Sequence, residues 1–291
     1  CGESRTYGVD QAKSVRIARD SEDTKEDFTY EGEKEIEVEF GATFNMPEVK
    51  AGEEVVEPVI TKGEEVVEKV NVNEAGVYIL TYTKEGYNDL VITVTVKEEI
   101  DEKVAKVSTA QELQEALNNN QIETIILEAD ITANLDIKRS IVIDGANKTL
   151  EGKIIIHSNN VILKNLTVDL NMDKPKEWQS GSYAVQVYKA TNAVLENVTL
   201  TKANAGLLVN GGKVEVKDVK SVANGFGGIE VSQGKNVDTI PKLTVNGLTH
   251  DNAETPAIWI DGKTTNDGWV EGEGFEEIVP EGKVQLWFKA K

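Results

Sequence analysis

The sequence predicts an all-β protein of 291 residues, in which a small β-sandwich precedes a right-handed, single-stranded parallel β-helix with an N-terminal capping helix. Three observations support this fold class. Short strands separated by Gly and Pro fill residues 34–100, one amphipathic helix follows at residues 108–120, and a repeat of about 22 residues dominates the rest. Repeats of this length stack into solenoids, because no single repeat can bury its own apolar side.

The charge of the chain restricts its partners. The net charge is −20, which argues against nucleic acid, because phosphate neutralisation requires a basic face. It also argues against adsorption of the protein surface to an anionic bilayer. Residues 1–103 carry 26 acidic and 12 basic side chains, whereas the remainder carries 25 and 19. This asymmetry predicts two units with different surfaces.

The single cysteine is Cys1, so no internal disulfide can form. Cys1 precedes Gly2 and a polar, charged segment, a pattern typical of mature bacterial lipoproteins, in which this cysteine carries lipid. The alternative is a fragment that starts at a cysteine by chance. We expect lipid attachment at Cys1, a tether over residues 1–33 with one short strand at 14–18, and contact with the membrane only through the lipid.

Residues 34–100 form the predicted sandwich. β-branched residues alternate along short runs, and Gly or Pro recurs about every ten residues. Residues 38–51, 73–83 ("NEAGVYILTYT") and 91–96 ("VITVTV") resemble the immunoglobulin-like domains of bacterial surface proteins. That resemblance implies a spacer or adhesive module, and no catalytic residue pattern is present in this segment.

The predicted helix begins with a capping box, since Thr109 and Glu112 have the required spacing. Leu113, Ala116 and Leu117 form one apolar face. We expect this helix to cover the open end of the β-helix, where bare strands would otherwise expose apolar side chains and unpaired backbone.

The repeat is clearest in four strands that start at Tyr183, Ala205, Gly227 and Pro256, with the first three spaced by 22 residues. Two inward stacks are predicted, one for each of two buried positions along these strands: Val185, Leu207, Ile229 and Ile258, and then Val187, Val209, Val231 and Ile260. A second strand type carries Asn165, Asn197 and Asp218 at equivalent positions. Asn and Asp tolerate left-handed backbone, so these residues predict a bend in each coil.

Residues 107–131, 135–152 and 159–170 ("NNVILKNLTVDL") are similar to the start of the pectate-lyase-like domains of Gram-positive surface proteins. In particular they resemble the group described as pectate-lyase-like adhesive domains. The resemblance covers residues 104–205 well and the remaining coils by periodicity. It implies a β-helix exposed on the extracellular surface of a bacterial cell, and it does not imply pectate cleavage. Together with the change in sequence texture along the chain, we expect domains at 34–100 and 104–291.

Catalytic residues are sparse. Lyases of this fold use an Arg or Lys base beside acidic calcium ligands, and Arg139 is the sole arginine of the β-helix segment. Hydrolases use converging carboxylates, and on the outward positions of the repeated strands only Glu230 and Asp261 are acidic. We predict a non-catalytic adhesin. The alternative is a polysaccharide lyase or glycoside hydrolase, acting at Glu230 and Asp261 on a surface or plant-type polysaccharide.

Ligand binding is predicted where the repeat is interrupted, at residues 171–182 and 261–282, because insertions in a solenoid often form its binding surface. The candidates are aromatic residues in these insertions or at outward positions: Trp178, Tyr188, Trp259 and Trp269. We expect the partner to be a polysaccharide or a protein at the cell surface.

A column of small residues is predicted to face outward beside these aromatics, and two functions are open for it: Ala184, Gly206, Gly228 and Ala257. It could form a shallow trough for a glycan, or it could allow close stacking of coils near the bend. We predict no cofactor. Calcium is the single candidate, because "DGKTTNDG" at residues 261–268 has the composition of a calcium loop, although its acid spacing matches no ligand pattern well.

Overall fold

The computed structural model describes residues 24–291, which divide into two compact units on either side of the Ile100–Asp101 junction. The predicted lipid site at Cys1 and the predicted strand at 14–18 lie outside the described residues. Among residues 24–291, no helix has the length and apolar character needed to cross a membrane.

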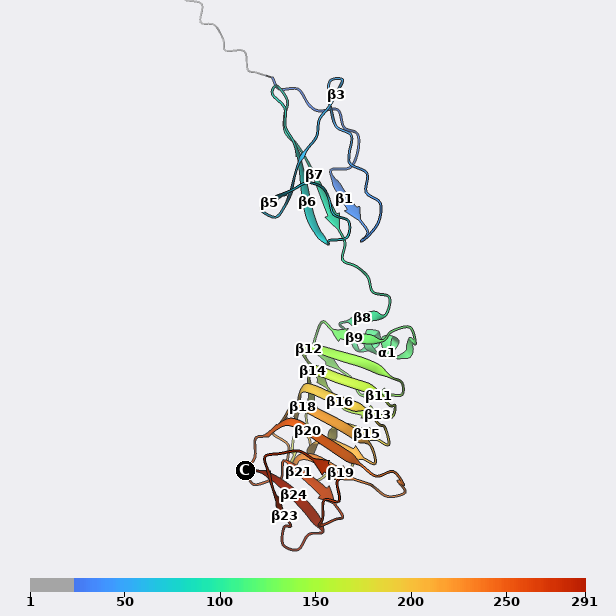
Figure 1. The fold of residues 1–291 in the computed structure, drawn as a ribbon, viewed down its shortest axis with the longest axis vertical. Helices are drawn as coiled ribbons and strands as arrows, with labels where there is room; N and C mark the ends of the chain where they lie inside the picture. The colour runs from blue at the N-terminus through green and yellow to red at the C-terminus, as the bar shows by residue number, and fades with distance from the viewer. Residues whose placement is uncertain (1–23) are drawn as a thin grey trace, which may run out of the picture. The chain divides into compact units, whose positions relative to one another are not determined.

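The first unit is a sandwich-like β domain (Figure 1). Its five-stranded sheet has the order β1-β7-β6-β4-β5, and a short hairpin, β2–β3, lies beside it. The strand bounds are β1 Glu35–Val38, β2 Lys50–Ala51, β3 Glu54–Val55, β4 Val59–Lys62, β5 Glu65–Val67, β6 Gly76–Tyr82 and β7 Leu90–Val96. One face of the sheet is buried under irregular segments that contribute Val49 and Val70. Phe28 and Tyr30 also pack against this core, so its contacts reach into the segment predicted as a tether.

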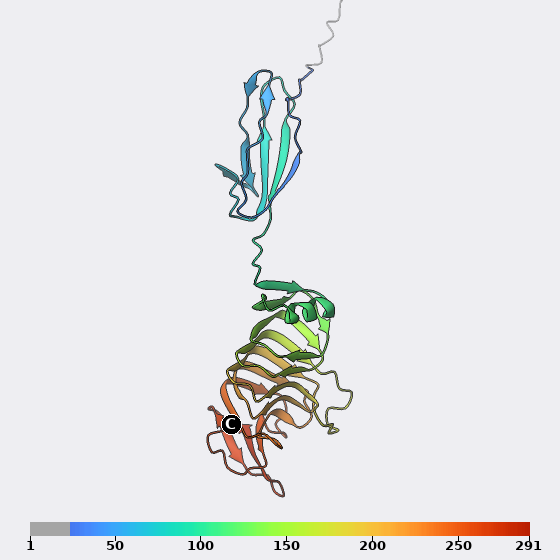
Figure 2. The ribbon, with the colours of Figure 1, turned by 90° about the vertical axis from the view of Figure 1, so that its right-hand side faces the viewer.

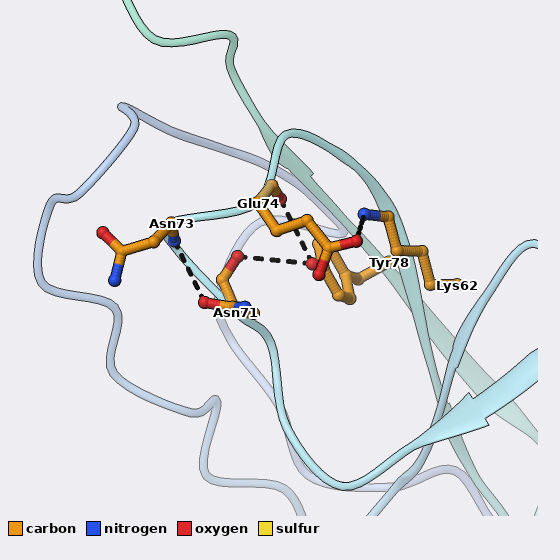
Figure 3. Close-up of polar contacts among 5 residues, drawn as sticks. All are labelled: Lys62, Asn71, Asn73, Glu74 and Tyr78. Carbon is orange, nitrogen blue, oxygen red and sulfur yellow. Dashed lines mark hydrogen bonds and ion pairs between the residues drawn. The ribbon is translucent and has the colours of Figure 1, made fainter.

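A polar clamp holds the turn before β6 (Figure 3). The Tyr78 hydroxyl donates to the carbonyls of Asn71 and Glu74, at 3.3 and 3.2 Å. The Asn73 amide donates to Asn71 Oδ1 at 3.1 Å. Lys62 Nζ pairs with Glu74 Oε1 at 2.6 Å and lies 5.3 Å from the centre of the Tyr78 ring. Each contact lies within the turn or connects residues of the turn, β4 and β6, so we assign the cluster a structural role.

The second unit begins with a β-α-β element formed by β8 (Val104–Val107), α1 (Ala110–Asn118) and β9 (Thr124–Leu127). The predicted capping box at Thr109 is confirmed, and the three predicted apolar residues of α1 pack into the core. One feature differs from the prediction: the parallel strand β8 precedes the helix. The helix is therefore the crossover between two parallel strands at the end of the β-helix (Figures 1 and 2).

Stacked coils build the rest of this unit as two long, mainly parallel sheets (Figure 1). One sheet joins β8 and β9 to β10 Ile131–Thr132, β12 Ile141–Glu151, β14 Val161–Asp169, β16 Ala193–Thr201, β18 Lys213–Val222, β20 Lys242–His250 and β22 Val270–Glu271. The other contains β11 Leu135–Ile137, β13 Ile154–Ile156, β15 Tyr183–Tyr188, β17 Ala205–Asn210, β19 Gly227–Ser232, β21 Ile258–Asp261, β23 Phe275–Ile278 and β24 Gln285–Ala290. These sheets confirm the predicted parallel β-helix.

Both predicted inward stacks are confirmed. In β15, β17, β19 and β21, Val185 pairs with Leu207, Leu207 with Ile229, and Ile229 with Ile258. The second stack continues from Val187 in the same register, and all eight side chains are buried in one core. Burial of apolar side chains is the main stabilising contribution in such a solenoid.

The predicted bends are also confirmed. Asn165, Asn197 and Asp218 have φ angles of 50°, 51° and 50°. Asn165 donates to Asp144 Oδ1 at 3.1 Å, and Asn197 donates to Asn165 Oδ1 at 2.9 Å, so a ladder of polar side chains links successive coils. Gly247 takes this place in β20, with φ 106°.

The column of small residues does not form an outward trough. Ala184 is fully buried in the main core, next to Val185, so two consecutive residues face inward at the start of β15. A Cβ on Gly206 would lie 2.8 Å from Leu200 Cβ, and one on Gly228 would lie 2.4 Å from the Ala257 carbonyl. The strict alternation behind the prediction fails at this bend, and small residues are required there for close packing.

Candidate functional site

A pocket of about 290 Å³ lies on the outer face of the sheet that contains β19, β21 and β24. Its walls combine aromatic rings with two carboxylates and one ammonium group: Trp178, Phe226, Glu230, Pro256, Trp259, Asp261, Lys283, Gln285 and Trp287. Tyr183, Leu208 and Trp259 form a small apolar cluster beneath it, separate from the main core.

The 171–182 insertion supplies Trp178, and a buried amide fixes that insertion. Asn204, 1% exposed, accepts from the Gln179 amide at 2.7 Å and donates to the carbonyls of Pro175 and Glu177, at 2.6 and 2.9 Å. A Cβ on Gly225 would lie 1.8 Å from the Pro175 carbonyl oxygen, so only glycine permits this approach.

Trp178 stands at the mouth of the pocket. Its ring meets those of Phe226 and Tyr183 edge to face, with centroid distances of 5.3 and 6.1 Å. Even so, 52% of the residue is exposed. A large aromatic ring that is fixed in position and still exposed is a typical ligand-contacting group.

The opposite wall comes from the last strand of the chain. β24 runs antiparallel to β21, which places Trp287 directly opposite Trp259 on the same face. Trp287 Nε1 donates to Gln285 Oε1, and Gln285 Nε2 donates to Asp261 Oδ1, both at 3.0 Å. This chain of hydrogen bonds orients both the indole and the carboxylate of Asp261.

Glu230 is the buried carboxyl of the site, only 8% exposed. Burial, and secondarily the negative charge of Asp261, raise its pKa to about 7, although the Tyr183 hydroxyl donates a hydrogen bond to Oε2 and opposes the rise. The same burial, together with Glu230, raises the pKa of Tyr183. Tyr183 therefore stays a hydrogen-bond donor, while Glu230 changes charge near neutral pH.

Lys283 is the one cationic residue in the pocket lining. Its Nζ lies 5.1 Å from the centre of the Trp287 ring, a cation–π distance. The side chain is exposed, and it forms no ion pair with any residue of the described range 24–291.

The structure brings four of the predicted site residues together: Trp178, Trp259, Glu230 and Asp261 all line this pocket. It places the other two elsewhere. Tyr188 lies near His157, at a ring distance of 6.0 Å, with Lys189 Nζ 5.4 Å from its ring centre. Trp269 packs against the main core, and Lys263 Nζ lies 4.6 Å from its ring centre.

Sequence reasoning missed Phe226, Lys283, Gln285 and Trp287. Phe226 had one usable signal, since it is a lone aromatic residue in a glycine-rich stretch directly before a repeated strand. No sequence signal marks Trp287 as a site residue. Its position depends on β24 pairing antiparallel with β21, whereas the repeat predicts that each new strand pairs parallel with the one before it.

The guanidinium of Arg139 is not free to act as a catalytic base, because it is hydrogen-bonded to the protein backbone. Its guanidinium donates to the carbonyls of Ala116, Leu117, Asn119 and Ile122, at 2.6–2.9 Å, and so satisfies the C-terminal end of α1. All its strong donor directions are used, which leaves no role in proton abstraction.

The loop at residues 261–268, which the sequence indicates as a calcium candidate, already contains a lysine that pairs with one of its carboxylates. Lys263 pairs with Asp267, and the Thr265 hydroxyl donates to the same carboxylate at 3.1 Å. Across residues 24–291 no three or more His, Cys, Asp or Glu side chains are grouped as metal ligands.

The model of a family described as "Putative pectate lyase-like adhesive domain" matches residues 104–256. No curated protein and no solved structure matches the chain.

Proposed function

The chain belongs to the pectate lyase-like adhesive domain family, which indicates an adhesin-like or carbohydrate-related role at a surface, and we propose that it is a non-catalytic adhesin that binds a glycan. The binding site in this proposal is the pocket between Trp178 and Trp287. The observation that carries the proposal is the pocket's composition.

Sugar rings present flat apolar faces edged with hydroxyl groups, and sites for them combine aromatic rings with a few fixed polar groups. The pocket has both. Trp178, Trp259 and Trp287 supply ring faces or edges, and Asp261 and Gln285 supply oriented acceptors and donors. Its position at the irregular end of the solenoid agrees with the general placement of binding surfaces in such folds.

A glycan array tests the proposal. The full chain should bind a limited set of saccharides, and Trp178→Ala should weaken that binding by about tenfold or more, because an exposed aromatic anchor is removed. Tyr188→Ala is the matched control, since Tyr188 lies on the same sheet outside the pocket. Equal binding by Trp178→Ala and the wild type would reject this site, and binding of the full chain to no saccharide would reject the glycan proposal.

A second function is supported by one specific observation: Glu230 and Asp261 share the pocket, and the pKa of Glu230 is raised to about 7. A pair of carboxyl groups, one of them with a raised pKa, is the arrangement used by glycoside hydrolases. A reducing-sugar assay on array hits, with an assay for unsaturated products, separates the two functions. Turnover that Glu230→Gln abolishes would replace the adhesin proposal with a hydrolase.

We further propose that Cys1 carries lipid and that the first unit acts as an acidic spacer between a bacterial surface and the β-helix. The support is the Cys1-Gly2 sequence, the polar segment that follows, and the surface role of the family. Mass spectrometry of protein from its native membrane should find diacylglycerol on Cys1, and an unmodified Cys1 in that material would contradict the anchor.

A further inference from the structure

The pocket has a charge pattern that a neutral sugar does not require. Glu230 and Asp261 place two carboxyl groups among the aromatic rings, and the whole chain carries a net charge of −20. An anionic ligand would lie beside these two carboxyl groups, and the negative charge of Asp261 already contributes to the raised pKa of Glu230. This pattern disfavours acidic saccharides and favours a positive group.

The aromatic walls are suited to the same kind of group. A cation is attracted to the negative face of an indole ring, and recognition of ammonium groups by several aromatic rings is a recurring use of this interaction. Trp178, Phe226, Trp259 and Trp287 surround the pocket, and the ring–ring distance of 5.3 Å between Trp178 and Phe226 fixes one side of it.

The chain itself shows an ammonium group in this environment. Lys283 Nζ lies over the Trp287 ring, yet it makes no ion pair with the described residues that would hold it there. The side chain is exposed and comes from the turn before β24, so it can swing into solvent at the cost of one cation–π contact. Lys283 thus acts as an internal stand-in for a ligand cation.

From these three observations, and resting on the proposed glycan-binding function, we propose that the pocket selects saccharides that carry an ammonium group. The ammonium contacts the Trp287 ring that Lys283 Nζ leaves and lies nearer to Asp261 than Lys283 Nζ does, on the side of the pocket that Asp261 lines. The sugar ring contacts Trp178 at the mouth of the pocket.

The test compares short glucosamine oligomers with their N-acetylated counterparts, which have the same ring but no charge. Affinity of the full chain is measured by calorimetry at high salt, near 1 M, where the Debye length is about 3 Å and general attraction to an acidic protein is screened. The free-amine oligomer should bind about tenfold more tightly than the acetylated one. Choline, whose ammonium is permanently charged, should compete with it, which assigns the effect to the cation.

Three variants test which residues produce the preference for the free-amine oligomer. Asp261→Asn should remove most of the preference for the amine, and Lys283→Ala should raise affinity for it several-fold, because the internal competitor is removed. Glu276→Gln removes one negative charge from an exposed position on a strand outside the pocket. It should change neither the preference for the amine nor the affinity for it.

Three outcomes overturn the inference. Tighter or equal binding of the acetylated oligomer would leave glycan binding intact and reject the cation preference. A preference that Asp261→Asn leaves unchanged would place the cation elsewhere on the protein. Failure of both oligomers to bind would reject the ligand class, and the array result with Trp178→Ala decides separately on the proposed function.

Discussion

Asn204 links the scaffold to the site through a single side chain. It is buried, and its three hydrogen bonds hold the 171–182 insertion against the β-helix. Asn204→Ala should lower the free energy of unfolding by about 2–3 kcal/mol, because buried backbone groups lose their partners. It should also weaken glycan binding, since Trp178 loses its position.

Urea unfolding and a binding titration check this prediction together, with Asn120→Ala, at an exposed asparagine, as the control. A variant that loses stability and still binds with wild-type affinity would show that the insertion does not position Trp178.

Glu230 makes stability depend on pH. Its pKa is raised to about 7 in the folded protein, from an ordinary value of 4.5, so the folded state holds a proton that the unfolded state has released between these values. The contribution of Glu230 to the free energy of unfolding is fully present below about pH 4.5. It is lost as pH rises through about 7, and its magnitude is at most about 3 kcal/mol.

Unfolding midpoints at about pH 5 and about pH 8 measure the effect. Glu230→Gln should flatten this part of the profile relative to the wild type, whereas the exposed Glu276→Gln should leave it in place. Identical profiles for the wild type and Glu230→Gln would mean that Glu230 is ionised throughout.

At the scale of the element, the bend in each coil is the part of the fold that the sequence specifies most directly. Asn165 has φ 50° and takes part in the ladder with Asp144 and Asn197. Asn165→Ala should destabilise the protein by about 1–2 kcal/mol, because alanine disfavours left-handed backbone and lacks the amide.

Asn165→Gly separates the two causes, since glycine accepts this φ but also lacks the amide. Chemical denaturation should rank the free energies of unfolding as wild type, then Asn165→Gly, then Asn165→Ala. A glycine variant as unstable as the alanine variant would assign the whole effect to the hydrogen-bonded ladder.

Elements with local signals were predictable, and those fixed by distant contacts were not. The 22-residue spacing and the inward stack from Val185 follow from residues within one coil and its copy. The position of β24 depends on how the last coil closes, and the inward turn of Ala184 depends on the bend before β15. A periodic sequence pattern predicts neither of these two features.

The same division applies to the site. Glu230, Trp259 and Asp261 could be placed from the repeat, because they sit on regular rungs. Trp178 is predictable as a residue of an insertion, but no sequence pattern indicates that Asn204 anchors that insertion. Trp287 joins the pocket only through the antiparallel pairing of β24 with β21, so this one of the four aromatic lining residues could not be predicted from the repeat.

At the scale of the whole molecule, every residue of the pocket lies in the unit Asp101–Lys291. This unit has its own core and its own covering helix. We therefore predict that residues 101–291, produced alone, fold and bind the array saccharide with the affinity of the full chain. Circular dichroism and calorimetry check both parts, and a folded fragment with an affinity more than about tenfold lower would assign part of the site to the first unit.

We propose that the regular coils of the β-helix provide the scaffold and that the irregular segments, which contribute Trp178 and Trp287 to one pocket, bind the ligand. A crystal structure with the strongest array saccharide tests this claim most directly. We expect the sugar in the pocket, in contact with Trp178, Trp259 and Trp287. A sugar bound along the regular rungs, for example against Tyr188, would contradict it.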